Sequence, residues 1–228
     1  MKTGNHPKLI AILGGSGAGK TWLARRLQRE FSPQAARLAL DDFYRDLSHL
    51  APASRAEVNF DNPQAIDWPA FEKALRDCRN GRVTQIPQYD FVTHTRLPDG
   101  KIFSPRPLIL VEGLWLLWSP QIAELFDLKI YLDCPQRLRL ERRLFRDVAE
   151  RGRTPDSVRC QFSETVAPMH EQFVAPQAKL ADIILKQPPS EMELFEVTEA
   201  IRLEMNEARA FRNNAPAHEE FCLQANLI

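Results

Sequence analysis

The sequence predicts an α/β fold in which a parallel sheet is covered by helices on both faces. Short apolar runs, such as residues 9–13 and 108–111, alternate along the chain with longer amphipathic segments. Such runs are typical of strands buried on both faces, and their alternation with helices is typical of parallel sheets. The first run leads directly into a glycine-rich segment and then into a helix, an arrangement that favours phosphate binding.

The glycine-rich segment fits the pattern G-x-x-x-x-G-K-[ST] of the phosphate-binding loop, or P-loop. Its glycines allow a tight turn that directs backbone N–H groups at phosphate oxygens, and the start of the following helix adds the positive end of its dipole. The Lys20 ammonium would reach the β- and γ-phosphates, and the Thr21 hydroxyl would ligate Mg²⁺. The pattern therefore predicts a P-loop NTPase fold, with these nucleotide-binding residues: Gly14, Gly15, Ser16, Gly17, Ala18, Gly19, Lys20 and Thr21.

Length and charge limit the classes of protein that the chain can belong to. Its 228 residues suffice for one large domain with a substantial core. The 30 basic and 30 acidic residues give a formal net charge of zero, so we predict no nucleic-acid partner. Nucleoside triphosphates and small molecules are the partners that a P-loop favours.

Cysteine usage and hydropathy indicate a cytoplasmic location. The cysteines contain no C-x-x-C pair, which is typical of reduced thiols and not of a disulfide framework or a zinc site. The N-terminal residues 1–7 lack the apolar core of a signal peptide. The longest apolar stretch, residues 108–118, is interrupted by Glu112 and is too short to cross a membrane, so no membrane partner is predicted.

The first part of the chain predicts two strands that both end near the P-loop. Residues 8–13 form the first strand, and the helix after the loop runs to about residue 31, where Ser32-Pro33 ends it. Residues 37–40 form a short strand that delivers Asp41 and Asp42 at its carboxyl end, which is the sheet edge where ligands bind. A polar loop follows over residues 45–58.

The middle of the chain predicts a helix and then an inserted β-hairpin. Asp67 is a candidate N-cap, with Pro69 in the first turn, and Asn80-Gly81 ends the helix. Residues 83–88 alternate apolar and polar side chains, residues 98–100 form a turn, and residues 101–103 return. We therefore expect a hairpin over about residues 83–104.

The remainder of the chain predicts further strands at 108–111, 128–132 and 182–185. Helices are expected over 135–152, from 155 with a kink at Pro168, and over 191–209. Residues 1–186 would form one domain, with an arginine-rich lid over about 137–153. Residues 187–228 would form a C-terminal helix and tail packed on the same domain, or on a neighbouring subunit.

Three carboxylates are candidates for phosphoryl-transfer chemistry. Glu112 ends an apolar strand, so it could hold Mg²⁺ directly or through water; the alternative is a carboxylate that caps a helix. Asp41 and Asp42 compete for the role of general base. Successive residues at a strand end point to opposite faces, so only one should face the phosphates, unless both belong to an acidic turn.

The predicted lid helix carries seven arginines within residues 137–153. Several lie three or four residues apart and share a helix face, from which guanidinium groups could clamp phosphates. The alternative is a solvated face paired with Glu141, Asp147 and Glu150.

Aromatic side chains gather beside the predicted hairpin. Tyr89, Phe91, His94 and Arg96 could form a slot for a flat base and read its edge by hydrogen bonds. The alternative is an ordinary hairpin core.

Taken together, these motifs resemble the uridine kinases (uridine–cytidine kinases) of the phosphoribulokinase/uridine kinase group. Two stretches are much more specific than the P-loop: residues 59–63, Asn-Phe-Asp-Asn-Pro, and residues 87–96, which fit Pro-x-Tyr-Asp-Phe-x-x-His-x-Arg. The others occur in the family's order over about residues 8–186, namely 14–21, 41–45, 111–113, 142–147 and 150–153.

The resemblance implies a role for each matching residue. Asp41 matches the family's general base, Lys20 and Arg146 would join it in catalysis, and Thr21, Asp41 and Glu112 match the residues at the metal. The residues that match the acceptor site are Asp61 for the ribose, Tyr89, Phe91 and His94 for the pyrimidine, and Arg143 and Gln161 near the nucleoside. Arg146, Arg151 and Arg153 match arginines of the lid and the phosphate site.

The implied activity is the phosphorylation of the 5′-hydroxyl of uridine and cytidine, with ATP or GTP as donor and Mg²⁺ as cofactor. The implied fold places the hairpin over the acceptor site, in a homo-oligomer, either a dimer or a tetramer. Asp42 departs from the family pattern, and Asp-Asp-Phe also occurs in nicotinamide riboside kinases. A kinase of another small alcohol (nicotinamide riboside, ribulose 5-phosphate, pantothenate or glycerate) is therefore the alternative. A GTPase switch is disfavoured because the chain has no N-K-x-D segment.

Overall fold

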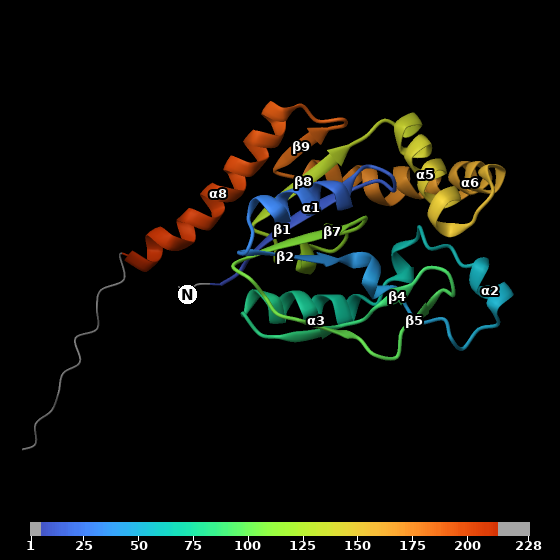
Figure 1. The fold of residues 1–228 in the computed structure, drawn as a ribbon, viewed down its shortest axis with the longest axis horizontal. Coiled ribbons are helices and arrows are strands. Elements are labelled where there is room, and N and C mark those ends of the chain that lie inside the picture. The colour runs from blue at the N-terminus through green and yellow to red at the C-terminus, as the bar shows by residue number, and fades with distance from the viewer. Residues whose placement is uncertain (1–5, 214–228) are drawn as a thin grey trace, which may run out of the picture.

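The computed structural model describes residues 6–213, and its centre is a parallel sheet of five strands (Figure 1). The order across the sheet is β2-β7-β1-β8-β9. The strands are β1 (Lys8–Gly14), β2 (Ala35–Ala39), β7 (Leu108–Gly113), β8 (Leu128–Asp133) and β9 (Ile183–Lys186). The predicted parallel sheet is therefore confirmed.

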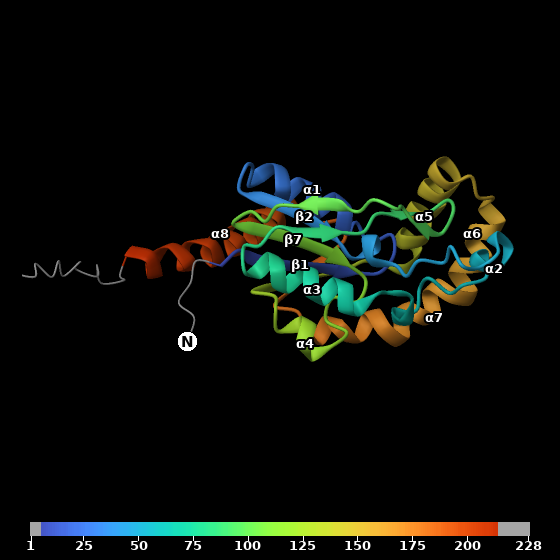
Figure 2. The same cartoon turned by 90° about the horizontal axis from the view of Figure 1, so that it is seen from below.

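Helices cover both faces of this sheet, as the sequence predicts. Figure 2 shows α1 (Lys20–Glu30) on one side, and α3 (Trp68–Arg79) and α4 (Pro120–Ala123) on the other. Buried side chains of β1 alternate between two cores: Ile10 and Ile12 pack with α1 and with α8 (Glu191–Asn213), whereas Leu9, Ala11 and Leu13 pack with α3. Strand β1 is thus buried on both faces, which explains its continuous apolar run.

The strand register brings the functional segments to one edge of the sheet. Ile12 pairs with Glu112, and Gly14, the last residue of β1, pairs with Leu132 of β8. Strand β2 ends at Ala39, which also pairs with Glu112, and a 3₁₀ turn η1 (Leu40–Phe43) follows. Glu112, the P-loop and the aspartates of η1 therefore meet at the carboxyl edge of the sheet.

The inserted hairpin forms as two short antiparallel pairs. Strand β3 (Thr84–Ile86) pairs with β6 (Lys101–Phe103), and β4 (Tyr89–Asp90) pairs with β5 (Thr95–Arg96). The sequence predicted one strand through residue 88. Pro87 separates β3 from β4 because proline cannot donate a hydrogen bond to a strand ladder.

Residues 155–180 differ from the predicted helix with a kink at Pro168. Helix α6 (Pro155–Gln161) continues through a π turn, a short helix α7 (Ala167–Met169), a second π turn and a 3₁₀ turn. These turns are Phe162–Val166, His170–Val174 and Ala175–Leu180. The π turns absorb Pro168 because they shift the hydrogen-bond pattern that the proline interrupts.

Other elements agree with the sequence apart from short helical turns. Helix α5 (Gln136–Arg151) ends at Gly152, which has φ +64°, as a C-terminal glycine should. Short helices α2 (Pro52–Ala56) and η2 (Pro63–Ala65) occupy segments predicted as loop or turn. The predicted C-terminal tail lies outside the described residues. No helix within residues 6–213 has the length and apolar character of a membrane span.

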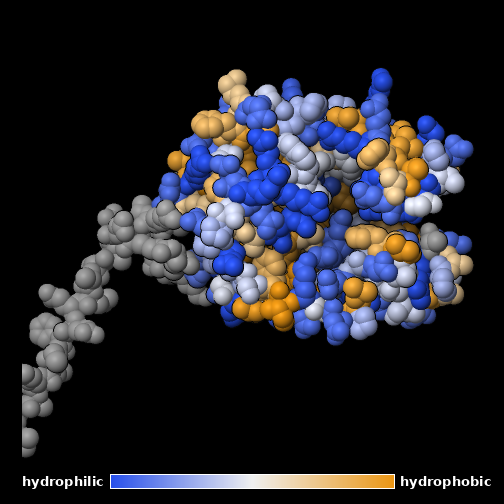
Figure 3. Space-filling model, in the orientation of Figure 1, coloured by the Kyte–Doolittle hydropathy of each residue, from blue (hydrophilic) through white to orange (hydrophobic). Residues whose placement is uncertain are grey.

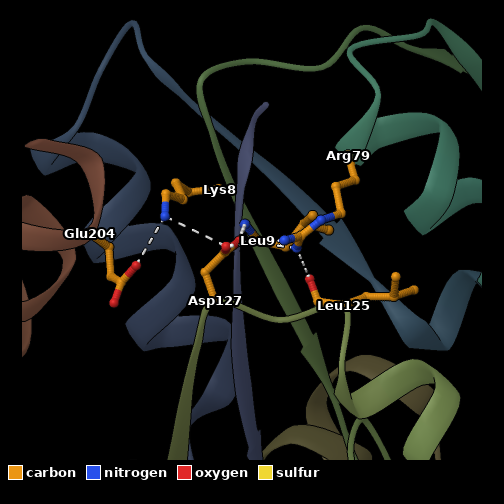
Figure 4. A network of polar contacts seen from close by, with 6 residues as sticks. All are labelled: Lys8, Leu9, Arg79, Leu125, Asp127 and Glu204. Carbon is orange, nitrogen blue, oxygen red and sulfur yellow. Dashed lines mark hydrogen bonds and ion pairs between the residues drawn. The ribbon is translucent and has the colours of Figure 1, made fainter. Parts of the chain in front are cut away.

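A polar network fixes the opposite edge of the sheet (Figure 4). The Asp127 carboxylate accepts a hydrogen bond from the backbone N–H of Leu9 at 2.8 Å and pairs with Lys8 at 3.6 Å and Arg79 at 3.3 Å. Lys8 also binds Glu204 at 3.2 Å. The network joins α3 and α8 to β1 and β8, away from the carboxyl edge.

Candidate functional site

The P-loop adopts a conformation that requires its glycines. Gly14, Gly17 and Gly19 have φ angles of +147°, +82° and +98°. A Cβ on Gly17 would also lie 2.5 Å from the carbonyl oxygen of Arg139. Side chains other than hydrogen would therefore strain the loop, and the close approach of its backbone to α5 depends on glycine.

Lys20 is the first residue of α1, and its side chain reaches back to the P-loop that precedes this helix. Its ammonium donates hydrogen bonds to the carbonyl oxygens of Gly14 and Gly15, both at 3.0 Å. Burial lowers the pKa of Lys20, whereas the Asp41 and Glu112 carboxylates oppose this shift. The structure thus places this cation between the loop and two predicted catalytic carboxylates.

Thr21 and Glu112 lie together, as the sequence predicts for metal-binding residues. The Thr21 hydroxyl donates to Oε2 of Glu112 at 2.6 Å, and Arg37 of β2 pairs with Oε1. Glu112 is only 5% exposed, so the hydrogen bond from Thr21 and the pair with Arg37 offset the cost of burying its carboxylate. Among residues 6–213 no group of three or more His, Cys, Asp and Glu side chains forms a metal cage. A site with few protein oxygen ligands is compatible with Mg²⁺, because this ion usually keeps several water ligands and binds the phosphates of the substrate.

The two adjacent aspartates of η1 have different partners. Asp42 pairs with Lys101 of the hairpin at 3.3 Å, and burial raises the pKa of Asp42. The Asp41 carboxylate instead raises the pKa of Lys20 and of Asp61, which indicates that it lies near the P-loop. These different neighbours favour Asp41 over Asp42 for the position that faces the phosphates, because Asp42 is paired with Lys101.

Asp61 lies in a turn that the Asn-Phe-Asp-Asn-Pro sequence builds locally. The Asn59 side chain accepts a hydrogen bond from the Asp61 N–H at 2.9 Å, and the Asn62 side chain accepts one from the Gln64 N–H at 2.9 Å. Burial raises the pKa of Asp61, and Arg143 opposes the shift. A buried carboxylate near positive charge remains available to accept hydrogen bonds from hydroxyl groups.

Aromatic rings line the hairpin side of the site. His94 stacks on Phe60 with ring centroids 4.5 Å apart, Tyr89 packs on Phe91 at 5.4 Å, and Tyr44 packs on Tyr89 at 5.2 Å. Burial and the nearby Arg151 charge lower the pKa of His94, so its imidazole is neutral at pH 7. Figure 3 shows a hollow between the part of the surface formed by α5 and α6 and the part formed by α2, β4 and β5.

The sequence groups Arg96 with these aromatic residues, but in the structure its side chain contacts η1 and the start of α3. Its guanidinium donates to the carbonyl oxygens of Tyr44 at 2.8 Å and Phe43 at 3.2 Å, and it pairs with Asp67 at 3.1 Å. Arg96 therefore fastens the hairpin to η1 and to the start of α3.

The lid arginines gather around one buried carboxylate. Asp147, which is fully buried, pairs with Arg143 at 3.4 Å, Arg146 at 2.7 Å and Arg151 at 3.6 Å. Three positive charges around one negative charge leave a positive surplus that suits phosphate groups. By contrast, Arg137 is exposed and pairs with Glu141, so the solvated-face interpretation holds for that residue.

Two further contacts connect the lid to the rest of the site. Arg143 donates to the Ser16 hydroxyl of the P-loop at 2.6 Å and to Gln161 at 3.0 Å; Arg153 also binds the Gln161 side chain. Arg151 lies over the Phe91 ring, 5.1 Å from its centroid. The structure thus connects the lid to the P-loop through Arg143 and to the hairpin through Arg151.

Sequence reasoning missed a groove beside the P-loop. Trp22, Arg142, Gln187 and Leu194 line this groove of about 370 Å³. Arg142 donates to the carbonyl oxygen of Ala18 at 3.1 Å, and the buried Gln187 side-chain nitrogen has no partner in the described part of the chain. The only sequence signal was the arginine spacing in α5; Gln187 follows the last strand and had none.

A second group that the sequence did not indicate lies beside the loop. His170 of the second π turn is half-buried, and its Nδ1 has no hydrogen-bond partner among the described residues. Burial, together with the charges of Arg139 and Lys20, lowers the pKa of His170 to about 4. The imidazole therefore stays neutral over the pH range in which an unfolded chain would protonate it.

This depressed pKa predicts an acid-sensitive contribution to stability. Between about pH 6.5 and 4 the unfolded state binds a proton at His170 that the folded state does not, so stability falls as the pH falls. Because the side chain is partly exposed, solvent screening reduces the effect to about 2 kcal/mol. Denaturant unfolding at pH 7 and pH 4.5 should show that the native protein loses this much more stability than His170→Gln. Equal losses in both proteins would contradict the prediction.

Comparison with known proteins agrees with this geometry. The sequence model of the Phosphoribulokinase / Uridine kinase family matches residues 9–192. The chain belongs to this family. It is 41% identical over 183 residues to the uridine kinase of Clostridium perfringens, a match that covers 80% of this chain and 88% of that protein. It is 42% identical over 184 residues to the uridine kinase of Staphylococcus epidermidis, covering 80% and 89% of the two chains.

Solved structures agree on the fold of the family. Phosphoribulokinase from Rhodobacter spheroides superposes with a TM-score of 0.61 and 20% sequence identity. This match covers 80% of the present chain and 71% of that chain. The P-loop kinase fold predicted from the sequence is therefore confirmed.

Proposed function

We propose that the protein phosphorylates the 5′-hydroxyl of uridine and cytidine, with ATP or GTP as donor. The observation that carries this proposal is that Asp41 and Asp61 lie near each other and near Lys20 of the P-loop, and that Phe60, next to Asp61 in the chain, stacks on His94. The uridine kinases named above, at 41% and 42% identity, support the same substrate class.

Each carboxylate has a separate task in the proposed reaction. Asp61, which is half-buried and lies near the cationic side chains of Arg143 and Lys20, binds the ribose hydroxyls and orients the acceptor. Asp41, which faces Lys20, accepts the proton of the attacking 5′-hydroxyl. A weakly basic carboxylate suffices, because phosphoryl transfer depends mostly on positioning and on electrostatic stabilisation.

The cations neutralise the charge that develops on the transferred group. Lys20 binds the β- and γ-phosphates, Arg146 acts on the transition state, and Arg151 and Arg153 complete the phosphate site. Mg²⁺ would be held by Thr21 with Glu112 and Asp41, and when bound it would offset negative charge on the phosphate oxygens. We assign the groove beside Trp22 and Arg142 to the base of the donor.

The same proposal includes the organisation of the chain. Residues 1–186 form the kinase domain, with the hairpin at about 83–104 and the lid at about 137–153, and residues 187–228 add a C-terminal helix and tail. A homo-oligomer, either a dimer or a tetramer, and a cytoplasmic location stay predictions. Asp42 gives no support to another acceptor, since its carboxylate is engaged by Lys101.

A substrate panel tests the proposed reaction. The protein is incubated with Mg²⁺ and ATP or GTP against uridine, cytidine, adenosine and nicotinamide riboside, and the products are identified by mass. Uridine monophosphate as the main product is the expected result. Activity on a different acceptor alone would overturn the pyrimidine assignment of Tyr89, Phe91 and His94, and nucleotide hydrolysis without transfer would overturn the kinase proposal.

Substitution of His94 should weaken the selection of the nucleoside. His94 has φ +56°, a conformation that asparagine also tolerates, so His94→Asn removes the stacked ring at little backbone cost. We expect KM for uridine to rise about 10-fold, with kcat changed less than about threefold, because the stack and one polar contact are lost. Steady-state kinetics with uridine and adenosine measure the change, and an unchanged preference would place the base elsewhere.

A further inference from the structure

A cavity lies beside Gly15 of the P-loop, next to Arg139 and His170. Its volume is about 400 Å³, and it lies where β8 passes into α5. Arg139 Nη1 and His170 Nδ1 each lie 2.8 Å from the point that a Cβ on Gly15 would occupy. Both nitrogens therefore abut the same residue of the loop. Other residues that line the cavity are Tyr131, Asp133, Cys134, Gln136 and Glu171.

Arg139 is a buried cation without a matching anion. The residue is only 2% exposed, its Nε donates to the carbonyl oxygen of Cys134 at 3.2 Å, and its guanidinium packs over Phe162. Its Nη1 has no partner, and no ion pair to Arg139 occurs within residues 6–213. Burying a charge without a counter-ion costs free energy, and a bound anion next to Arg139 would offset this cost.

The start of α5 supplies further donors to the same cavity. This helix of 16 residues begins at Gln136, its N-cap Pro135 makes no side-chain hydrogen bond, and no acidic residue lies in its first turn. The first N–H groups of a helix have no acceptor within the helix, and the dipole there favours negative charge. His170 Nδ1, which has no partner among residues 6–213, can add a third kind of donor when it carries the ring proton.

We propose that this cavity is a second anion site, which binds the phosphoryl group of a small hydroxylated phosphate monoester. Arg139 and His170 line the cavity and the start of α5 adds backbone N–H groups; a set of three kinds of donor suits a tetrahedral group with three free oxygens better than a planar carboxylate. The volume exceeds that of a phosphate ion, and Asp133 and Glu171 can accept hydrogen bonds from hydroxyl groups at the rim. The site is separate from the catalytic P-loop cradle and is independent of the proposed nucleoside specificity.

The test follows the imidazole of His170 by NMR as inorganic phosphate is added to the full chain. A non-hydrolysable ATP analogue with Mg²⁺ keeps the P-loop cradle occupied, and His170→Gln identifies the signal. The other titratable groups that line this cavity are Tyr131, Asp133, Cys134, Arg139 and Glu171, and the Lys20 charge also acts on the pKa of His170. We expect phosphate to raise the pKa of His170 by about one unit or more, because an anion beside an imidazole favours its protonated form.

Substitutions on α5 distinguish this site from a general salt effect. Arg139→Met should abolish the phosphate-dependent shift, whereas Arg137→Met, at an exposed arginine on the same helix, should preserve it. If Arg139→Met does not fold, calorimetric titration of His170→Gln with phosphate should show at least about 10-fold weaker binding than the native chain. An unchanged His170 pKa, or binding unaffected by His170→Gln, would overturn the proposal.

The hydroxylated class of ligand has its own test. Glycerol 3-phosphate should bind more tightly than methyl phosphate under the same conditions, because only the former offers hydroxyl groups to Asp133 and Glu171. Equal affinities would overturn the assignment of the rim carboxylates.

Discussion

The Asp41→Asn variant is expected to lose about 10²–10⁴-fold in kcat, with KM for uridine little changed. Asparagine keeps the size of the side chain and its hydrogen-bonding capacity, but its amide cannot take the proton of the acceptor hydroxyl. Asp41 lies near Lys20 of the P-loop and near Asp61 of the proposed acceptor site, which is the position that the general base requires. Steady-state kinetics at saturating Mg²⁺ and ATP give both constants.

Asp42→Asn provides the matched control on the same turn. This substitution weakens the pair with Lys101, a contact between partly exposed groups that contributes little energy. Turnover should stay within about threefold of the native protein. Near-normal turnover of Asp41→Asn, together with a large loss in Asp42→Asn, would reverse the assignment of the base.

The Glu112→Gln variant should require about 10–100-fold more Mg²⁺ for half-maximal activity, as is usual when a group that orients a metal-bound residue is removed. Glu112 accepts the hydrogen bond of the Thr21 hydroxyl at 2.6 Å, so the amide would turn that hydroxyl away from the position in which it can bind a cation. The loss of charge also weakens attraction for the ion itself. Activity measured against Mg²⁺ concentration at saturating nucleotide reports the change.

Glu57→Gln is a suitable control because Glu57 is exposed and is not among the residues assigned to the metal. Its magnesium requirement should equal that of the native protein. If Glu112→Gln loses activity with an unchanged magnesium requirement, the carboxylate serves to support β2 and β7 through Arg37, and its role at the metal is wrong.

The parts of the fold that local chemistry determines could be predicted from the sequence. The run before the P-loop had to be a strand buried on both faces, and Gly152 had to end a helix. The π turns after Gln161 could not be predicted, because they follow from how that segment packs around Pro168 and not from a residue pattern. The hairpin is divided at Pro87. The alternating pattern of residues 83–88 predicted one strand and gave no sign that this proline would interrupt the pairing.

The candidate site was predictable where residues act through sequence motifs. Thr21 and Glu112 are 91 positions apart, yet the motif and the strand end sufficed to bring them together. The remaining features depend on tertiary contacts. Lys101 pairs with Asp42, which distinguishes Asp42 from Asp41. Asp147 pairs with arginines whose spacing was equally consistent with a solvent-exposed helix face. Arg37 carried no signal because its partner lies on another strand.

In the proposed reaction, the position of Arg151 would link acceptor recognition to turnover. Its guanidinium is shared between Asp147 of the lid and the ring of Phe91 in the hairpin. An acceptor that displaces Phe91 must also displace a positive charge from the phosphate side of the cleft. A badly fitting acceptor is therefore penalised twice, once in binding and once in the rate of the transfer step, so a single contact contributes to discrimination in both KM and kcat.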